Sequence, residues 1–271
     1  MSVYLQDINK LAVQPNFWGW IDGMYLAGND CGVAMRLKAG YEYEPVSRKL
    51  WRSLCKDAVI AVDVGAHTGI YSLDGWRAGA KAVVSIEPYH LNFARLVMNL
   101  RHSGFSTNYA IFVAAGKANA LSELHVNSRS DYCTSGGRTG ILVKPSIEIK
   151  SYPVKMKTLD SIIKDEFYGE VRVVKIDTER CVVNVLKGMA GILEHKPDLI
   201  IECIEDGIGG ILKPLGYHFY RINENAESEE LTEIDDLIPD DPITHNSPNR
   251  YATFRRYSDF LEREWVSLGT A

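Results

Sequence analysis

The sequence lacks several features that mark whole classes of protein. No run approaches the roughly 18–20 consecutive apolar residues of a membrane-spanning helix, and the first ten residues lack the basic start and apolar run of a secretory signal. The five cysteines are scattered and form no C-x-x-C pair, which fits neither a disulfide framework nor a zinc site. We therefore expect reduced thiols in a cytoplasmic protein that does not insert into membranes.

A basic surface for nucleic acids is also lacking. The 271 residues carry 30 Lys+Arg against 35 Asp+Glu, a net charge of −5, with no basic stripe and interleaved aromatics. Nine of the acids lie within residues 224–241, which hold no Lys or Arg, so the remaining chain sums to +4. We expect no nucleic-acid partner. The acidic block is interpreted as a solvated loop or, alternatively, as a flap at a site entrance that repels anionic ligands.

Short apolar runs alternate with helical patterns along most of the chain. Runs at 58–65, 82–88, 108–116, 171–177 and 198–204 have the β-branched content of buried strands, and most are followed by apolar residues at helical spacing. This alternation predicts βαβ units and a parallel sheet. A short half-buried strand is predicted at 121–127. A closing pair of strands is predicted at 217–222, parallel to the core strands, and at 251–257, which returns antiparallel. The predicted fold is α/β and Rossmann-like, with a mostly parallel seven-stranded sheet and helices on both faces.

Residues 1–50 differ from the rest because they are rich in aromatic residues and show no clean period. We predict an N-terminal helical extension packed on the core, with a lid over the substrate or a self-association surface of a homodimer as alternatives. Residues 51–271 form the predicted main domain, in which residues 223–250 are an acidic insertion.

The most informative motif is Asp63-Val-Gly65-Ala-His67-Thr-Gly69 at the end of the first main-domain strand. Glycines there let backbone approach a ligand, and the following helix offers free N–H groups. Glu87 ends the next strand, where a carboxylate can accept both hydroxyl protons of a ribose. NAD is one candidate ligand, but its pyrophosphate favours Gly-x-Gly-x-x-Gly. An acid at Asp63 suits the sulfonium and ammonium groups of S-adenosylmethionine better.

Several sequence blocks, in order, resemble the FkbM-type methyltransferases, a family of the class I, Rossmann-like group. VDVGAHTGIYSL is similar to the family's VDVGAN-x-G-x-x-S block, and SIEPYHLNFARLVMNL to its IEP-x-x-x-x-F-x-x-L-x-x-N block. Later blocks follow in the same order: FVAAGKANALSELHV, VKMKTLDSII, VVKIDTERCVVNVLKGM and PDLIIECIED. The resemblance runs from about Val59 to Glu205.

The resemblance implies a class I methyltransferase domain that binds S-adenosylmethionine at three strand ends. The implied cofactor residues are Asp63, Gly65, Ala66, His67 and Gly69 near the methionine part, Glu87 and Pro88 near the ribose, and Ala114 and Ala115 near adenine. For His67, a plain turn residue is the alternative.

Three carboxylates at the ends of the fourth and fifth strands are the candidate catalytic residues, namely Asp177, Glu179 and Glu202. In this fold, ligands lie beyond the carboxyl ends of the strands, so these groups can orient an acceptor or take its proton. They could alternatively bind Mg²⁺, which we do not favour. The next helix is predicted to start at Thr178, and Glu179 could instead only cap this helix.

One block departs from the family pattern K-x-D-x-E-G-x-E. The sequence KIDTERCV places Arg180 at the Gly and Val182 at the second Glu. Arg180 could pair with a substrate carboxylate or with Glu179. Further substrate contacts are predicted from a polar loop over 128–140 and from the segment before the last strand, at Asp131, Tyr132, Arg138 and His245.

The resemblance therefore predicts an S-adenosylmethionine-dependent methyltransferase, acting on a hydroxyl of a sugar or other glycan, a glycolipid or a natural-product small molecule. Two other functions stay open. The altered KIDTERCV block fits a methyltransferase-like binding module without turnover, and the glycine motif with Glu87 fits an NAD-dependent oxidoreductase.

Overall fold

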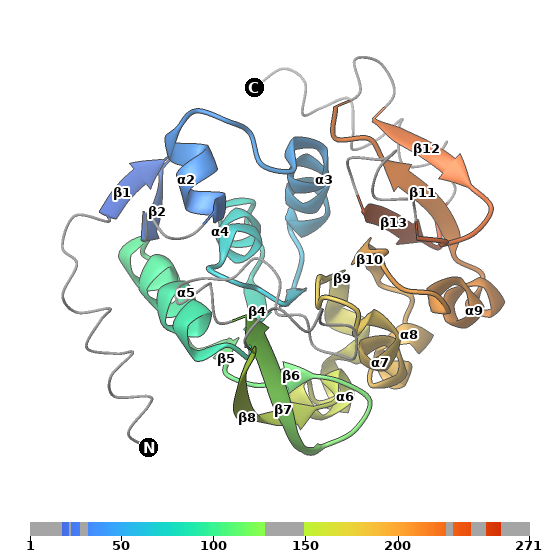
Figure 1. Cartoon of the computed structure of the whole chain (residues 1–271). Coiled ribbons are helices and arrows are strands. Elements are labelled where there is room, and N and C mark those ends of the chain that lie inside the picture. The colour runs from blue at the N-terminus through green and yellow to red at the C-terminus, as the bar shows by residue number, and fades with distance from the viewer. Residues whose placement is uncertain are drawn as a thin grey trace.

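The computed structural model describes residues 18–21, 23–27, 32–127, 149–225, 230–239 and 248–255. Its centre is one eight-stranded sheet in the order β12-β11-β13-β10-β9-β3-β4-β5 (Figure 1). The strands are β3 (Ile60–Val64), β4 (Ala82–Ile86), β5 (Ala110–Ile111), β9 (Val171–Ile176), β10 (Asp198–Glu202), β11 (His218–Ile222), β12 (Leu231–Ile234) and β13 (Asn249–Thr253).

Strands β5, β4, β3, β9 and β10 are parallel, and β13 pairs antiparallel with both β10 and β11. The predicted parallel sheet and the antiparallel return of the last strand are thus confirmed. The predicted count of seven strands is wrong by one, because β12 forms inside the acidic segment and pairs with β11 at the sheet edge. In β12, the exposed Thr232 and Glu233 lie between Leu231 and Ile234, and this short mixed pattern hides its strand character in the sequence.

The central strands are apolar because both faces of the sheet are covered. Ala61 and Val62 are adjacent in β3 and belong to two different core clusters, one on each face. Figure 1 shows α3 (Pro45–Cys55), α4 (Ile70–Arg77) and α5 (His90–His102) on one side of the sheet. On the other side lie α6 (Leu159–Ile162), α7 (Val182–Lys187), α8 (Ala190–Glu194) and α9 (Ile208–Leu212), with two short 3₁₀ helices at Asp165–Glu170 and Lys213–Leu215.

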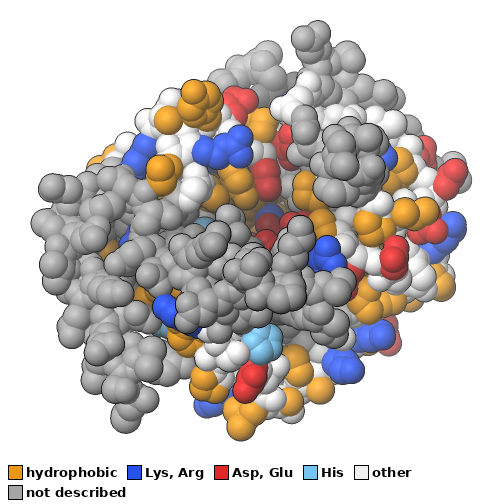
Figure 2. Space-filling view, viewed as in Figure 1, with side chains coloured by type: hydrophobic (Ala, Val, Ile, Leu, Met, Phe, Trp, Pro, Cys, Tyr) orange, Lys and Arg blue, Asp and Glu red, His pale blue; other side chains and the backbone are white. Residues whose placement is uncertain are grey.

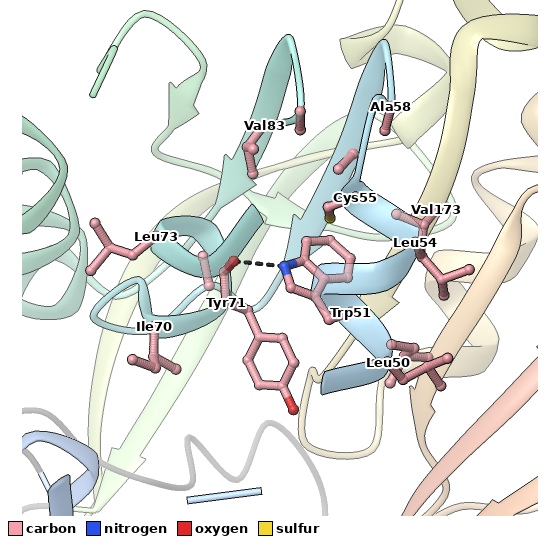
Figure 3. Packing of buried hydrophobic residues seen from close by; sticks show 14 of the residues in the cluster. Leu50, Trp51, Leu54, Cys55, Ala58, Ile70, Tyr71, Leu73, Val83 and Val173 are labelled. Atoms are coloured by element: carbon pink, nitrogen blue, oxygen red, sulfur yellow. Dashed lines mark hydrogen bonds between the residues drawn. The ribbon is translucent and has the colours of Figure 1, made fainter. Parts of the chain in front are cut away.

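Helix α3 belongs to the core, although the predicted boundary at residue 50 falls inside it. Trp51 is fully buried, packs among residues of α4, β4 and β9, and donates from Nε1 to the carbonyl oxygen of Tyr71 at 2.7 Å (Figure 3). Before α3, the chain forms the hairpin of β1 (Trp18–Ile21) and β2 (Met24–Ala27), then α2 (Gly32–Lys38). The N-terminal region is therefore not purely helical as predicted.

A second sheet of order β6-β8-β7 lies beside the main one and comprises β6 (Ala114–Ala115), β7 (Ala120–Asn127) and β8 (Ile149–Lys157). The single strand predicted over 108–116 is wrong, because a turn from Val113 N–H to the Ile111 carbonyl divides it between the two sheets. Strand β8 was not predicted. It contains Pro153, which is tolerated because β8 pairs there only with β7.

Two connections differ from the prediction. The helix predicted to start at Thr178 begins at Val182, because Glu179 and Arg180 adopt left-handed backbone with φ of 48° and 72°. The described residues of the acidic segment contact two separate parts of the domain. Glu224 contacts the start of α3, whereas Asp236 lies 3.9 Å from Lys213 near α9. None of the described helices is long and apolar enough to cross a membrane.

Candidate active site

A cavity of about 360 Å³ opens at the carboxyl ends of β3, β4, β9 and β10. From β3 the chain passes to β4 and β5 on one side and later to β9 and β10 on the other, so the strand order reverses above the cavity. Open α/β sheets bind ligands at such a switch point, and the volume suits a small molecule. Figure 2 shows acidic side chains in the hollow at the centre of this face.

Gly65 forms the tightest point of the cavity floor. Its φ is +80°, and a Cβ there would lie 1.8 Å from the carbonyl oxygen of Asp177. Asp177 N–H donates to the Val64 carbonyl, and Gly65 N–H donates to the Ile86 carbonyl, each at 2.9 Å. The ends of β3, β4 and β9 are thus joined by backbone, and only glycine fits between them.

Gly69 packs closely against a neighbouring helix. Its φ is +94°, and a Cβ would meet Leu96 Cδ1 at 2.6 Å. Gly69 immediately precedes α4 and is absent from the cavity lining, whereas Asp63, Ala66 and His67 are part of it. Gly69 therefore allows α4 and α5 to pack closely.

Glu87 presents a fixed carboxylate to the cavity. The backbone N–H groups of His67 and Tyr89 donate to its two oxygens, each at 2.8 Å. Burial raises the pKa of Glu87, while the His67 charge and these hydrogen bonds act against the rise. The Asn92 side chain also hydrogen-bonds this carboxylate, so of its roughly four lone pairs one is left for a ligand. Pro88, Ala114 and Ala115 also line the cavity.

Asp63 lies beside Lys175, the buried cationic side chain of the site. It is 1% exposed, and Oδ2 accepts from Ser72 Oγ at 2.6 Å, while nothing in the described part of the chain donates to Oδ1. Asp63 and Lys175 are register partners on β3 and β9. Burial raises the pKa of Asp63, and the Lys175 charge opposes this rise.

Lys175, Asp177 and Glu202 form a chain of ionisable groups. Lys175 Nζ lies 2.7 Å from Asp177 Oδ2, and Glu202 hydrogen-bonds Asp177 from the neighbouring strand. Burial raises the pKa of Asp177, but the lysine outweighs it and holds that pKa below its usual range. Burial and then the charges of Asp177 and Glu179 raise the pKa of Glu202 to about 9. At neutral pH, Glu202 is therefore a donor and Asp177 an anion.

The departures from the family pattern lie outside the cavity. Glu179 lines it, but the Arg180 side chain is exposed and absent from the lining, and Val182 is fully buried in the core. The left-handed φ of Arg180 explains why glycine suits this position. Glu205 caps α7, because its Oε1 accepts from Val183 N–H at 2.9 Å.

The predicted substrate residues of the polar segments and the alternative metal site remain to be placed. Asp131, Tyr132, Arg138 and His245 lie outside the described residues. Across the ranges that the structure describes, no group of three or more His, Cys, Asp or Glu side chains is placed to hold a metal ion. Asp177, Glu179 and Glu202 therefore do not assemble into the Mg²⁺ site that was the alternative.

Sequence reasoning missed one wall of the cavity, which is formed by Tyr43, Glu44 and Tyr71. Tyr71 Oη donates to Glu44 Oε2 at 2.6 Å. Tyr43 and Glu44 precede α3 and reach the cavity only because α3 packs against α4. Tyr71 follows the glycine motif directly, and that proximity is the one sequence signal that could have identified it.

A mostly parallel α/β sheet with a ligand cavity at its switch point, a glycine turn after one strand and an acid after the next defines a Rossmann-like cofactor-binding domain. The family model of the methyltransferase FkbM domain matches residues 63–238. The chain belongs to this methyltransferase family.

Solved structures with a similar arrangement include methyltransferases. A methyltransferase FkbM from Methylobacillus flagellatus KT is 20% identical with a TM-score of 0.45, and the match covers 72% of this chain and 44% of that one. Precorrin-6y C5,15-methyltransferase from Geobacter metallireducens GS-15 is 12% identical with a TM-score of 0.42, covering 87% and 96%. The chain thus spans less than half of the first protein. No curated protein matches the sequence.

Proposed function

We propose that the protein uses S-adenosylmethionine to methylate a hydroxyl group of a small uncharged molecule such as a sugar, a glycolipid headgroup or a natural product. One observation carries this proposal. A single cavity contains both the fixed carboxylate of Glu87 at one end and the ionised Asp177, with its lysine and carboxylic-acid partners, at the other.

The residues present fit the cofactor. Glu87 would hold a ribose hydroxyl with its remaining lone pair, and Gly65 shapes the cavity floor where a larger residue would collide with Asp177. Asp63 and the other carboxylates surround the cavity with negative charge, which suits a cation. When bound, the cofactor supplies an electrophilic methyl group on a good leaving group.

Asp177 is the residue that we place against the acceptor hydroxyl. Lys175 and Glu202 fix its carboxylate, so it can accept a hydrogen bond from the hydroxyl and orient the oxygen. Its lowered pKa makes it a weak base. A weak base suffices because a hydroxyl oxygen that gains a third bond becomes strongly acidic, so Asp177 takes the proton late.

An active methyltransferase is favoured over a methyltransferase-like module that binds a ligand without turnover. The two departures, Arg180 and Val182, place no side chain in the cavity lining, whereas the lining residues Asp177, Glu179 and Glu202 are all present. Folding alone does not require this set of half-buried acids.

Calorimetric titration with S-adenosylmethionine, S-adenosylhomocysteine and NAD tests the cofactor. We expect binding of the first two and none of NAD. Failure of both sulfur compounds to bind would reject the methyltransferase function, and binding of NAD alone would favour an oxidoreductase. Binding of both without label transfer from radioactive cofactor to any hydroxylated acceptor would favour the inactive module.

Replacement of Asp177 by Asn tests the acceptor end. Turnover should fall at least about tenfold, given the usual size of acid–base contributions, while affinity for S-adenosylhomocysteine is largely kept. The exposed Asp206→Asn, beyond β10, is the matched control and should leave turnover unchanged. An unchanged rate in Asp177→Asn removes this residue from the mechanism.

A further inference from the structure

The wall of Tyr43, Glu44 and Tyr71 is held together by hydrogen bonds. The Tyr71 hydroxyl donates to Glu44 at 2.6 Å, and the Tyr43 hydroxyl also hydrogen-bonds the Glu44 side chain. Glu44 has φ 45° and ψ 57°, the left-handed region that non-glycine residues rarely adopt. Such backbone persists where surrounding contacts enforce it, and it is frequent at ligand sites.

This wall lies at the Asp177 end of the cavity, away from Glu87. After burial and Glu44, the charges of Asp177 and Glu202 contribute to raising the pKa of Tyr43. Lys175, the partner of Asp177, places its Nζ 4.3 Å from the centre of the Tyr71 ring. The wall therefore borders the position at which the acceptor hydroxyl meets Asp177.

The acidic segment holds the wall in place from outside. Glu224 accepts from the backbone N–H of Val46 at 2.8 Å and of Ser47 at 3.2 Å, in the first turn of α3 and directly after Glu44. Lys49 in the same helix pairs with Glu230 at 2.8 Å. Tyr43 and Glu44 also lie outside residues 63–238, which match the family model. This wall thus belongs partly to a segment that the shared domain does not contain.

We propose that Tyr43, Glu44 and Tyr71 bind the acceptor and select uncharged molecules with neighbouring hydroxyl groups over anionic ones. The proposal rests on the methyltransferase function given above. Both tyrosine hydroxyls donate their hydrogen bonds to Glu44, so the wall offers only hydrogen-bond acceptors to a ligand. A hydroxyl-rich molecule can donate to it. A carboxylate or phosphate cannot donate and is repelled by Glu44.

The test measures ligand contact and affinity in the presence of saturating S-adenosylhomocysteine. Saturation-transfer NMR is recorded with methyl glucoside, glucuronate and glucose 6-phosphate, which share a ring and differ in charge. Only methyl glucoside should show contact with the wild-type protein. The variants are Glu44→Gln and Tyr71→Phe. The matched controls are Glu42→Gln and Tyr41→Phe, whose side chains are exposed just before the wall.

Glu44→Gln should weaken methyl glucoside binding about tenfold, the usual effect of losing a charge-assisted hydrogen bond, and Tyr71→Phe should weaken it by a smaller factor. Both controls should bind like wild type, and the affinity of all variants for S-adenosylhomocysteine should stay within about twofold. Tyr71→Phe keeps the test valid if Glu44→Gln does not fold.

Three results would overturn the proposal. They are a preference for either anionic sugar, the absence of contact with all three probes, and a loss of S-adenosylhomocysteine affinity in Glu44→Gln equal to the loss for methyl glucoside. The last result would assign Glu44 to the cofactor. Failure of wild type itself to bind S-adenosylhomocysteine is a separate outcome, because it rejects the proposed function rather than the role of the wall.

Discussion

The two ends of the cavity are built by different means. At the Glu87 end, backbone hydrogen bonds and the close approach at Gly65 fix the shape. At the other end, buried and half-buried ionisable side chains hold one another, with Lys175 between Asp63 and Asp177. The first arrangement tolerates little change of shape, whereas the second tolerates little change of charge. Substitutions should therefore have separable effects at the two ends.

The largest effect is expected at Gly65. Gly65→Ala places a methyl group 1.8 Å from a backbone oxygen and should lower the unfolding free energy by more than about 4 kcal/mol. Gly40→Ala is the control, because Gly40 has nearly the same φ, +79°, with nothing within 4 Å. It should cost only about 1 kcal/mol. Denaturant unfolding measures both, and equal losses would show that backbone angle alone requires the glycine.

The next largest effect is expected at Lys175, whose Nζ is buried beside Asp177. Lys175→Met leaves the carboxylates of Asp63 and Asp177 without their cation and should cost about 3 kcal/mol at pH 7. The loss should shrink in acid, where Asp177 is neutralised. Lys187→Met on the exposed side of α7 should change stability by less than about 0.5 kcal/mol. A similar change in both would mean that the buried pair contributes nothing.

A smaller effect is expected from the pH dependence at Glu202. Its pKa of about 9 in the folded protein lies above the ordinary 4.5, so the folded state keeps a proton that the unfolded chain releases. This contribution to stability is complete below pH 4.5 and is lost as pH rises through about 9. Glu202→Gln, which still donates to Asp177, should be more stable than wild type at pH 9 by at least about 1 kcal/mol. Parallel stability curves for the two proteins would contradict the shift.

The smallest effect is expected at Arg180. Its φ of 72° suits glycine, so Arg180→Gly should raise the unfolding free energy by about 1 kcal/mol. Because the side chain is exposed and outside the lining, cofactor affinity should not change. Arg101→Gly, in α5, should instead destabilise by roughly 0.5–1 kcal/mol. Destabilisation by both would show that the arginine makes contacts that outweigh its backbone strain.

The parts that sequence reasoning found are those whose chemistry is local. Strands β3, β4, β9 and β10 are apolar because both faces are covered, and Gly65, Glu87, Asp177 and Glu202 follow from their ends. The parts that it missed depend on distant packing. Strand β12 lies at a sheet edge and β8 lies in the middle of the small sheet, and both mix polar and apolar residues. Tyr43 and Glu44 enter the cavity through α3.

The order of strands in the main sheet also constrains how the chain can assemble. Strand β13 lies between β10 and β11, although β11 and β12 precede it in the chain. During synthesis, the hairpin of β11 and β12 cannot pair with the main sheet until residues 249–253, which form β13, have left the ribosome. Glu224, which accepts a hydrogen bond from the first turn of α3, lies just after β11. We therefore expect the Asp177 end of the cavity to be completed late, after the Glu87 end already has its shape.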